Sequence, residues 1–175
     1  MMNKVFEVIE TQRIFNLQKS KIHILIHEKS YVHAIVQFKN GLKKILVHDT
    51  NMVIPIFNTI YGDDNEFINS KNLDLKSLNN LNFKFVDKKR FPLIDILRLI
   101  PEHYSLFETV LVSANDTFVS LFLENKITYI DFQKKLKKFI KLKEFTKLKR
   151  RKPRNINEIY ALNEQVRLKI KSLCI

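Results

Sequence analysis

The sequence predicts an α+β protein, in which part of an α/β layer (one helix and a three-stranded segment) is followed by an all-α helical bundle. Three patterns carry this prediction. Apolar residues recur at helical spacing over residues 2–17, alternate with polar residues over residues 22–48, and return to helical spacing from Pro92 onward. Apolar residues make up 45% of the 175 residues, which is enough for a folded core and excludes a disordered chain.

The first part of the chain predicts one helix and three strands. Residues 2–17 form an amphipathic helix, with Val5 and Ile9 on its apolar side. Three segments alternate between apolar and polar residues and predict strands: 22–27, 32–38 and 43–48. Asn40-Gly41 predicts a type I′ hairpin turn between the last two strands, because both residues tolerate the positive φ of that turn.

The rest of the chain predicts mainly helices. Residues 54–61 predict a short helix, the polar segment 62–80 a connection, and 81–85 an edge strand. Four further helices are predicted, over residues 92–100, 107–124, 129–143 and 155–172. Asn155 and Asn157 are candidate caps for the start of the last one. These four helices are expected to pack together as a bundle.

The composition excludes several classes of protein. With two glycines, the chain has no glycine-rich loop to cradle a nucleotide phosphate. Cys174 is its only cysteine, so no intrachain disulfide is expected and a reducing compartment fits. No fully apolar run reaches about 18 residues, so no membrane-spanning helix is expected. The mixed charge of the first residues is not that of a signal peptide.

The net charge of +13 is concentrated in residues 134–154, where twelve Lys and Arg residues face one acid, Glu144. Such a run is typical of a nucleic-acid or anionic-surface contact. An apolar stripe at helical spacing continues into the run, at Phe132, Leu136 and Phe139, which favours a solvated helix face without a nucleic-acid partner. The alternative, a non-catalytic basic protein that binds nucleic acid or an acidic partner through residues 134–154, stays open.

The first helix also carries a set of polar residues. Asn3 and Glu7 lie one turn apart on one face, with Lys4 beside them. An amide, an ammonium and a carboxylate then converge within reach of one small ligand. In a helix taken by itself, Lys4 and Glu7 are more often solvent-facing residues.

Four other residues that have functional side chains also have simpler explanations. His23 and His27 share a strand face, as a zinc pair would, but no third ligand is apparent. His33 is more often a hydrogen-bonded sheet histidine, and Met52 a core residue.

Several strings of residues, in register over nearly the whole chain, carry a resemblance to a known family. They are Met1-Met2-Asn3-Lys4 with Glu7; Ile26-His27 followed by Ser30, Val32 and His33; Met52 before Pro55-Ile56; Leu73-Asp74-Leu75; Phe91-Pro92; and Ala114-Asn115-Asp116. In these strings the chain resembles 1-deoxy-D-xylulose 5-phosphate reductoisomerases. The first string is the most specific of them.

The resemblance implies roles for five residues. Asn3 and Lys4 would contact the phosphate and hydroxyls of the substrate, since lysine offers a phosphate a point charge and asparagine both donates and accepts. Glu7 would be one of the substrate-binding residues and would also act as the third carboxylate ligand of Mg²⁺ or Mn²⁺. His33 would border the active site as a catalytic residue, and Met52 would lie beside the nicotinamide of NADPH.

The implied enzyme is an NADP-dependent oxidoreductase and isomerase of isoprenoid biosynthesis. It converts 1-deoxy-D-xylulose 5-phosphate, a phosphorylated sugar, to 2-C-methyl-D-erythritol 4-phosphate with NADPH and the divalent metal. The resemblance further implies a homodimer, or a separate chain that supplies the N-terminal half. It implies a cytoplasmic protein, or one of a plastid-type organelle in a eukaryote, with no membrane partner.

The resemblance covers only the back part of such an enzyme. Residues 1–61 would be the end of the catalytic domain, 62–87 a linker, and 88–175 the helical C-terminal domain. The NADPH-binding domain, two metal-binding carboxylates and the phosphate-binding serines of the family do not occur in the sequence. The chain is therefore expected to be a fragment that is inactive by itself. Thr50-Asn51, where the family has Pro-Asp, is a departure in a segment expected to close over the substrate.

Overall fold

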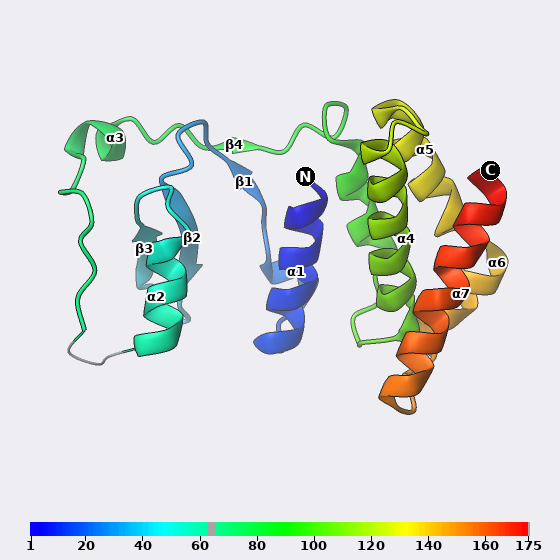
Figure 1. Cartoon of the computed structure of the whole chain (residues 1–175). Coiled ribbons are helices and arrows are strands. Elements are labelled where there is room, and N and C mark those ends of the chain that lie inside the picture. Colours follow the sequence, from blue (N-terminus) through cyan, green and yellow to red (C-terminus); the bar gives the residue numbers. More distant parts are fainter. Residues whose placement is uncertain (63–65, 175) are drawn as a thin grey trace. The chain divides into compact units, whose positions relative to one another are not determined.

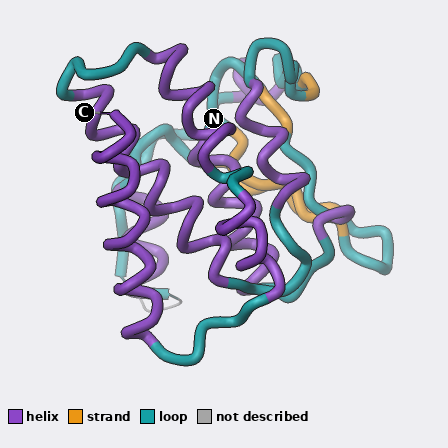
Figure 2. The backbone as a smooth tube through the Cα atoms, turned by 90° about the vertical axis from the view of Figure 1, so that its right-hand side faces the viewer, coloured by secondary structure: helices purple, strands orange, loops and turns teal. Residues whose placement is uncertain are grey.

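The computed structural model describes residues 1–62 and 66–174 (Figure 1). Its contacts divide the chain into two compact units. The first, called the helical unit, comprises Met1–His23 and Asp87–Ile175, and the second, called the strand unit, comprises Ile24–Val86. The predicted α+β class is confirmed: long helices dominate, and the few strands are short (Figure 2).

The helical unit is built around one central helix. Its elements are α1 (Met2–Ile14), η1 (Lys19–Lys21), η2 (Pro92–Leu99), α4 (Leu106–Leu123), α5 (Tyr129–Phe139), α6 (Lys143–Thr146), η3 (Lys147–Arg150) and α7 (Ile156–Cys174). Helix α4 packs against α5, α6, η3 and α7, while α1 packs against η2. Among the described residues, every buried apolar side chain belongs to this unit.

Three helix boundaries in this unit differ from the prediction. Helix α1 ends at Ile14, since Asn16 takes a left-handed conformation with φ 50°. The segment predicted as a helix over 92–100 is a 3₁₀ helix that ends before Pro101, which disfavours helical geometry in the preceding residue. The predicted helix 129–143 stops at Phe139, because Leu142 is extended (φ −57°, ψ 138°) before α6 begins.

Side-chain caps explain where the main helices begin. At α4, the Ser105 hydroxyl accepts from the Phe107 N–H (3.2 Å), while the Glu108 carboxylate accepts from the Ser105 N–H (2.9 Å). At α5, the Thr128 hydroxyl accepts from the Asp131 N–H (3.1 Å), while the Asp131 carboxylate accepts from the Thr128 N–H (3.3 Å). Asn155 caps α7 as predicted, since its Oδ1 accepts from the backbone N–H of the residue three positions later (3.0 Å).

Helix α4 corrects the expectation that the chain has no stretch able to cross a membrane. Its 18 residues, Leu106–Leu123, are long and apolar enough by length and composition. Within the helical unit 56% of this stretch is buried, and a core helix of a globular domain passes the same test. Its residues Phe107, Val110 and Leu111 are completely enclosed by protein atoms.

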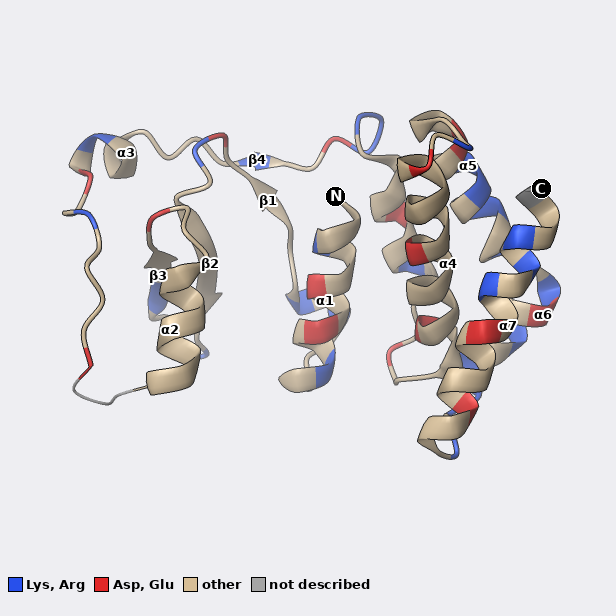
Figure 3. Cartoon of the chain, viewed as in Figure 1, with Lys and Arg blue, Asp and Glu red and all other residues tan. Residues whose placement is uncertain are grey.

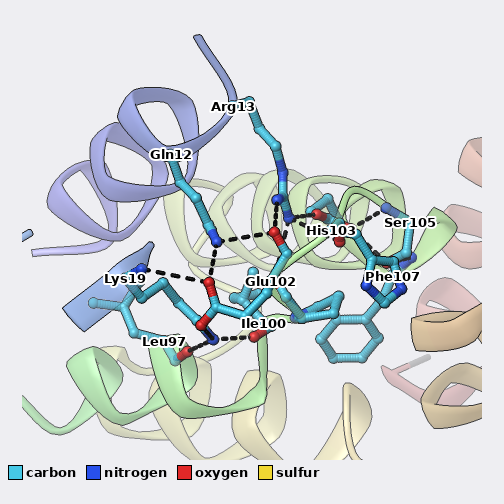
Figure 4. Close-up of polar contacts among 11 residues, drawn as sticks. Gln12, Arg13, Lys19, Leu97, Ile100, Glu102, His103, Ser105 and Phe107 are labelled. Atoms are coloured by element: carbon cyan, nitrogen blue, oxygen red, sulfur yellow. Dashed lines mark hydrogen bonds and ion pairs between the residues drawn. The ribbon is translucent and has the colours of Figure 1, made fainter. Parts of the chain in front are cut away.

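A polar network fixes the end of α1 against the loop that precedes α4 (Figure 4). The Arg13 guanidinium donates to the carbonyls of Glu102 (2.6 Å), Pro101 (3.1 Å) and His103 (3.1 Å), and it also pairs with the Glu108 carboxylate. These carbonyls lie outside any helix and have no helical N–H partner, and the Arg13 side chain supplies donors to all three. We call this set of contacts the Arg13 clamp.

Two neighbouring side chains extend the network. Gln12, only 3% exposed, donates to the Glu102 carbonyl (3.0 Å) and carboxylate (2.7 Å). The Lys19 ammonium donates to the carbonyls of Leu97 (3.4 Å) and Ile100 at the end of η2. A cation is favourable there, because the last carbonyls of a helix are the negative end of its dipole.

Replacing Arg13 by alanine is expected to destabilise the helical unit by about 1–3 kcal/mol, because the partly buried bonds of Arg13 to Glu108 and to the Pro101 carbonyl are lost. The matched control is Arg98→Ala: Arg98 is 72% exposed and lies 3.9 Å from its partner Asp95. This exposed pair should contribute less than about 0.5 kcal/mol. Urea unfolding followed by far-UV circular dichroism measures both values. Equal losses in the two variants would contradict a structural role of the clamp.

The Thr128 cap is expected to control the pKa of Asp131. The Thr128 hydroxyl and backbone N–H hold the pKa of Asp131 below its ordinary value of 3.8, with Lys135 and Lys134 helping. Because the pKa is lowered in the folded state, the stabilisation is present above pH 3.8 and is lost as the pH falls through the folded-state value. Thr128→Val should raise this pKa, as measured by an NMR titration of the carboxyl group. The Glu124 carboxyl, bonded to Lys126, is the internal control and should not change.

In its described residues, the strand unit has two separate two-stranded antiparallel sheets and two helices. Its elements are β1 (Leu25–Ile26), β2 (Val32–Gln37), β3 (Lys43–Val47), α2 (Val53–Tyr61), α3 (Leu75–Asn79) and β4 (Lys84–Phe85). The three predicted strands are present and the predicted hairpin of β2 with β3 is confirmed, but β1 is not part of the same sheet. Strand β1 pairs with β4, with Leu25 opposite Phe85, while β2 pairs with β3. Helix α3, capped by Asp74, lies within the segment predicted as a connection, of which residues 63–65 are outside the described part.

The hairpin turn between β2 and β3 differs from the predicted type I′ turn. Gly41 has φ 87°, but Asn40 is not among the described residues with positive φ. The Gly41 N–H donates to the Phe38 carbonyl (3.1 Å), and the Phe38 N–H donates to the Leu42 carbonyl (2.8 Å). This is the three-residue loop in which a type I turn is followed by a left-handed glycine.

The two units meet between residues 23 and 24 and between residues 86 and 87, and the second of these positions lies next to the predicted start of the helical domain at residue 88. Helix α1 belongs to the helical unit, because its buried side packs on η2 and its end is held by the Arg13 clamp. Among the described residues of the strand unit, none is buried. The assignment of residues 1–61 to a catalytic domain concerns a longer protein and stays a prediction.

Candidate functional site

The polar residues predicted on the first helix do converge. The Asn3 amide donates to Oε1 of Glu7 and the Lys4 ammonium donates to Oε2, both at 2.6 Å. Each carboxylate oxygen therefore has one side-chain donor, which fixes the plane of the carboxylate. The Lys4 and Glu7 side chains are 50% and 42% exposed, so all three groups stay accessible to a ligand.

Packing of α1 explains why these residues share the open face. Met2, Val5 and Val8 are buried against the rest of the helical unit, at the spacing of one helix face. Residues 3, 4 and 7 fall on the opposite side and remain at the surface. The cluster is therefore placed by a rigid helix whose far end is anchored by Arg13.

A shallow pocket of about 350 Å³ lies beside the cluster, within the helical unit. Asn3 forms part of its wall. The other lining residues are Met1, Met2, Phe6, Phe91, Pro92, Leu93, Asn115, Val119, Tyr129, Phe132 and Gln133. Most of them are apolar or aromatic, and the charged residues Lys4 and Glu7 are not among them.

Glu7 can supply one ligand to a hard cation, but the described residues do not complete a metal site. No group of three or more His, Cys, Asp or Glu side chains comes together in residues 1–62 and 66–174. Magnesium and manganese need several oxygen ligands. Of the residues in the cluster, only Glu7 is therefore suited to bind magnesium or manganese. Its carboxylate is oriented by the Asn3 and Lys4 side chains.

The zinc pair considered for His23 and His27 gains no support. His23 belongs to the helical unit and His27 to the strand unit. Nε2 of His27 accepts a hydrogen bond from the Val32 N–H (2.9 Å), so its lone pair is already used.

His33 and Met52, the other two predicted site residues, lie in the strand unit. His33 occupies an irregularity of β2, where Val32 pairs with Val47 and Ala34 with Leu46. Its ring stacks on that of His48, with centroids 3.5 Å apart and an interplanar angle of 13°. Met52 is the residue before α2 and its side chain is 69% exposed.

Sequence reasoning missed His48. The alternation of β2 and β3 identified the two strands, and their pairing would bring the end of one close to the start of the other. The register shift at His33, which aligns the two rings, leaves no signal in the sequence. Thus the structure groups Asn3, Lys4 and Glu7 in one unit, and His33 with His48 in the other.

The basic run covers the outside of the helical unit. Its apolar residues face inward, since Leu136, Phe139 and Phe145 are buried, while its Lys residues lie along α5 and α6, and further Lys and Arg residues lie on α7 (Figure 3). Two of its charges are used within the unit: Glu144 pairs with Lys169 of α7, and Arg151 pairs with Glu158. This arrangement is that of a solvated face over a helical core.

Comparison with known proteins adds the deciding observation. Residues 48–169 match the family model described as the DXP reductoisomerase C-terminal domain. Over all 175 residues the chain is 57% identical to the 1-deoxy-D-xylulose 5-phosphate reductoisomerase of Pelagibacter ubique. The chain belongs to the 1-deoxy-D-xylulose 5-phosphate reductoisomerase family. The resemblance of the sequence strings is thereby confirmed.

Other relatives give the same family at lower identity. The reductoisomerase of Persephonella marina is 40% identical over 129 residues, which are 74% of this chain and 35% of that protein. A reductoisomerase crystal structure in complex with NADPH, fosmidomycin and magnesium matches 99% of the chain with a TM-score of 0.84 and 27% identity, and 43% of that structure is covered. The enzyme of Zymomonas mobilis in complex with NADPH has the same fold, with a TM-score of 0.82.

The chain spans less than half the length of these reductoisomerases: it covers 45% of the Pelagibacter protein and 45% of the Zymomonas structure.

Replacing Glu7 by glutamine is expected to leave the fold intact. The Lys4 and Glu7 side chains are 50% and 42% exposed, so the Lys4–Glu7 pair should contribute about 1 kcal/mol or less to the free energy of unfolding. Glu108→Gln is the contrasting variant, because Glu108 is 16% exposed and pairs with Arg13. Its loss should reach about 2 kcal/mol or more. Urea denaturation of both variants tests this, and a large loss in Glu7→Gln would show that the cluster is structural.

Proposed function

We propose that this chain supplies the C-terminal part of a 1-deoxy-D-xylulose 5-phosphate reductoisomerase, which forms 2-C-methyl-D-erythritol 4-phosphate with NADPH and a divalent metal. The observation that carries this proposal is the 57% identity over the whole chain to such an enzyme. The convergence of Asn3, Lys4 and Glu7 supports it, because a phosphorylated sugar and a cation need groups of these types.

In this proposal the three side chains of α1 have distinct roles. The Lys4 ammonium and the Asn3 amide bind the phosphate and hydroxyl groups of the substrate. Glu7 contacts the substrate site and gives one oxygen ligand to Mg²⁺ or Mn²⁺, while the remaining ligands come from outside the described residues. When bound, the metal supplies polarisation of the substrate oxygens.

The strand unit contributes His33 and Met52 to the same proposal. His33 borders the substrate, and Met52 packs beside the nicotinamide of NADPH. The exposure of Met52 supports this role, since an apolar side chain that is 69% exposed is available to cover a flat aromatic ring.

The isolated chain is proposed to be inactive, because the described residues offer one metal-ligating carboxylate at the cluster and no glycine-rich loop. Activity then requires the N-terminal part of the enzyme, on the same chain or on a separate one, and a homodimer is the proposed assembly. We place the enzyme in the cytoplasm, or in a plastid-type organelle of a eukaryote.

A chimaera tests the proposal. The 175 residues replace the matching segment of the Pelagibacter enzyme, and NADPH oxidation is followed with 1-deoxy-D-xylulose 5-phosphate and Mg²⁺ or Mn²⁺. The chimaera should be active, and Glu7→Gln should lower its rate by about 100-fold or more, since a charged group at the reacting centre is lost.

Glu10→Gln is the matched control on the same helix, where Glu10 is exposed and outside the cluster. Its rate should stay within about twofold of the unsubstituted chimaera. A chimaera with normal activity after Glu7→Gln would overturn the metal-ligand role. NADPH consumption by the isolated chain would overturn its proposed inactivity.

A further inference from the structure

Six exposed basic residues follow one another along the surface of the helical unit. They begin on α5 and continue through α6 and η3, and we call them the basic ridge: Lys134, Lys138, Lys141, Lys143, Lys147 and Arg150. No more than four positions separate successive members, and residues three or four positions apart on a helix have Cβ atoms about 5–6 Å apart. This is less than the Debye length of about 8 Å at physiological salt, so the charges of the ridge repel one another.

Acidic groups near the ridge are already engaged elsewhere. None of its six side chains forms a salt bridge with a described residue. Glu144 pairs with Lys169 of α7, and the Asp131 carboxylate, which attracts Lys134, accepts a hydrogen bond from the Thr128 hydroxyl (2.7 Å). A helix face that is only solvated commonly carries both signs of charge. Burial of the apolar side explains where the lysines lie, but it does not explain why they are all of one sign.

An exposed aromatic ring lies where the basic ridge ends. Tyr104, in the loop before α4, is 50% exposed, and Nζ of Lys152 lies 5.5 Å from the centroid of its ring. The Leu106 N–H donates to the Arg151 carbonyl (2.8 Å), which ties the start of α4 to the residue that follows η3. The chain therefore places a row of cations next to an accessible aromatic ring that already carries a cation.

We propose that the basic ridge and Tyr104 form a surface that binds single-stranded nucleic acid. The ridge contacts phosphates along the strand, a base stacks on the Tyr104 ring, and Lys152 exchanges the ring for a phosphate. The ring favours a single strand over a duplex, because the faces of unpaired bases are open to an aromatic side chain. Neither the ridge nor Tyr104 has a role in the proposed reaction, so this binding adds to the proposed function and does not depend on it.

Binding is measured by the fluorescence anisotropy of a labelled oligouridylate added to the full 175-residue chain. An oligonucleotide of about 12 nucleotides suffices, since sites of this kind span about 4–16 nucleotides. At a salt concentration of about 0.1 M the Kd should be about 1–100 µM. Each phosphate contact adds about −0.7 to the slope of log K against log salt concentration, so six contacts predict a slope of about −4. A slope near zero would overturn the proposal.

A double variant of the ridge tests where the strand binds. Lys138→Gln/Lys141→Gln should weaken binding about tenfold or more and make the slope shallower by about 1.4, because two phosphate contacts are lost. Lys39→Gln/Lys43→Gln is the control, since it removes the same charge from exposed positions of the strand unit. Its Kd should stay within about threefold of the native value. Equal losses in the two variants, with native circular dichroism spectra, would show that net charge alone attracts the strand.

Two substitutions of Tyr104 test the stacking. Tyr104→Ala should weaken binding of the oligouridylate about 5- to 100-fold, the range expected for one base stacked on an aromatic ring. Tyr104→Phe keeps the ring and should bind within about threefold of the native chain. The salt slope should stay the same in both, because tyrosine carries no charge. Unchanged affinity in Tyr104→Ala would overturn the stacking and with it the assignment to a single strand.

Other polyanions separate the possible partners. A duplex of the same length, polyglutamate, and vesicles of phosphatidylserine and phosphatidylcholine should all bind more weakly than the oligouridylate. A duplex, polyglutamate or vesicles bound as tightly would overturn the proposal, and the partner would then be double-stranded nucleic acid, an acidic protein or a membrane surface respectively. An inactive chimaera would defeat the proposed function without affecting these measurements, and an active chimaera whose 175-residue segment binds no oligouridylate would defeat only the present proposal.

Discussion

The Arg13 clamp is the interaction on which the helical unit depends. The segment between η2 and α4 leaves the carbonyls of Pro101, Glu102 and His103 without helical partners, and one guanidinium satisfies all three. The same group pairs with Glu108, whose other oxygen closes the cap of α4. One side chain thus joins α1 to the start of the central helix. The Arg13 clamp therefore also helps to position the cluster of Asn3, Lys4 and Glu7 at the beginning of α1, because a helix is rigid along its length.

The two units differ in the way they hold their functional side chains. In the helical unit a continuous apolar core fixes α1, so Asn3 and Glu7 need only helix geometry to meet. The described part of the strand unit has no buried residue, and a two-stranded hairpin is marginally stable by itself. Local contacts must therefore supply its order. The stack of His33 on His48 is one of them, and its loss should affect the hairpin more than a similar loss would affect the core.

Regular periodicity was predictable from the sequence, and long-range pairing was not. Helices α4 and α7 were predicted to within about two residues, because each has an apolar pattern at helical spacing, and Asn155 was also predicted as a cap of α7. The pairing of β1 with β4 joins residues about sixty positions apart and depends on two residues in each strand. The same division holds for the site. Asn3 and Glu7 were found from a spacing of four residues, whereas His48 meets His33 through a bulge that alternation does not reveal.

The pairing of Glu7 with Lys4 leaves both groups available for exchange of partners. In an exposed salt bridge the attraction of the ions is nearly offset by the loss of hydration and side-chain entropy, so breaking it costs about 1 kcal/mol or less. When a phosphate binds to the Lys4 ammonium in place of Glu7, Lys4 gains a doubly charged partner that forms stronger hydrogen bonds. Glu7 is then left with Asn3 and an unneutralised charge, which raises its attraction for a divalent cation. Under the proposed function, substrate phosphate and metal therefore favour each other's binding through this one carboxylate. In the absence of substrate and metal, the pairing of Lys4 with Glu7 leaves no unpaired charge in the cluster. Little free energy is then needed to break this pair when the ligands bind.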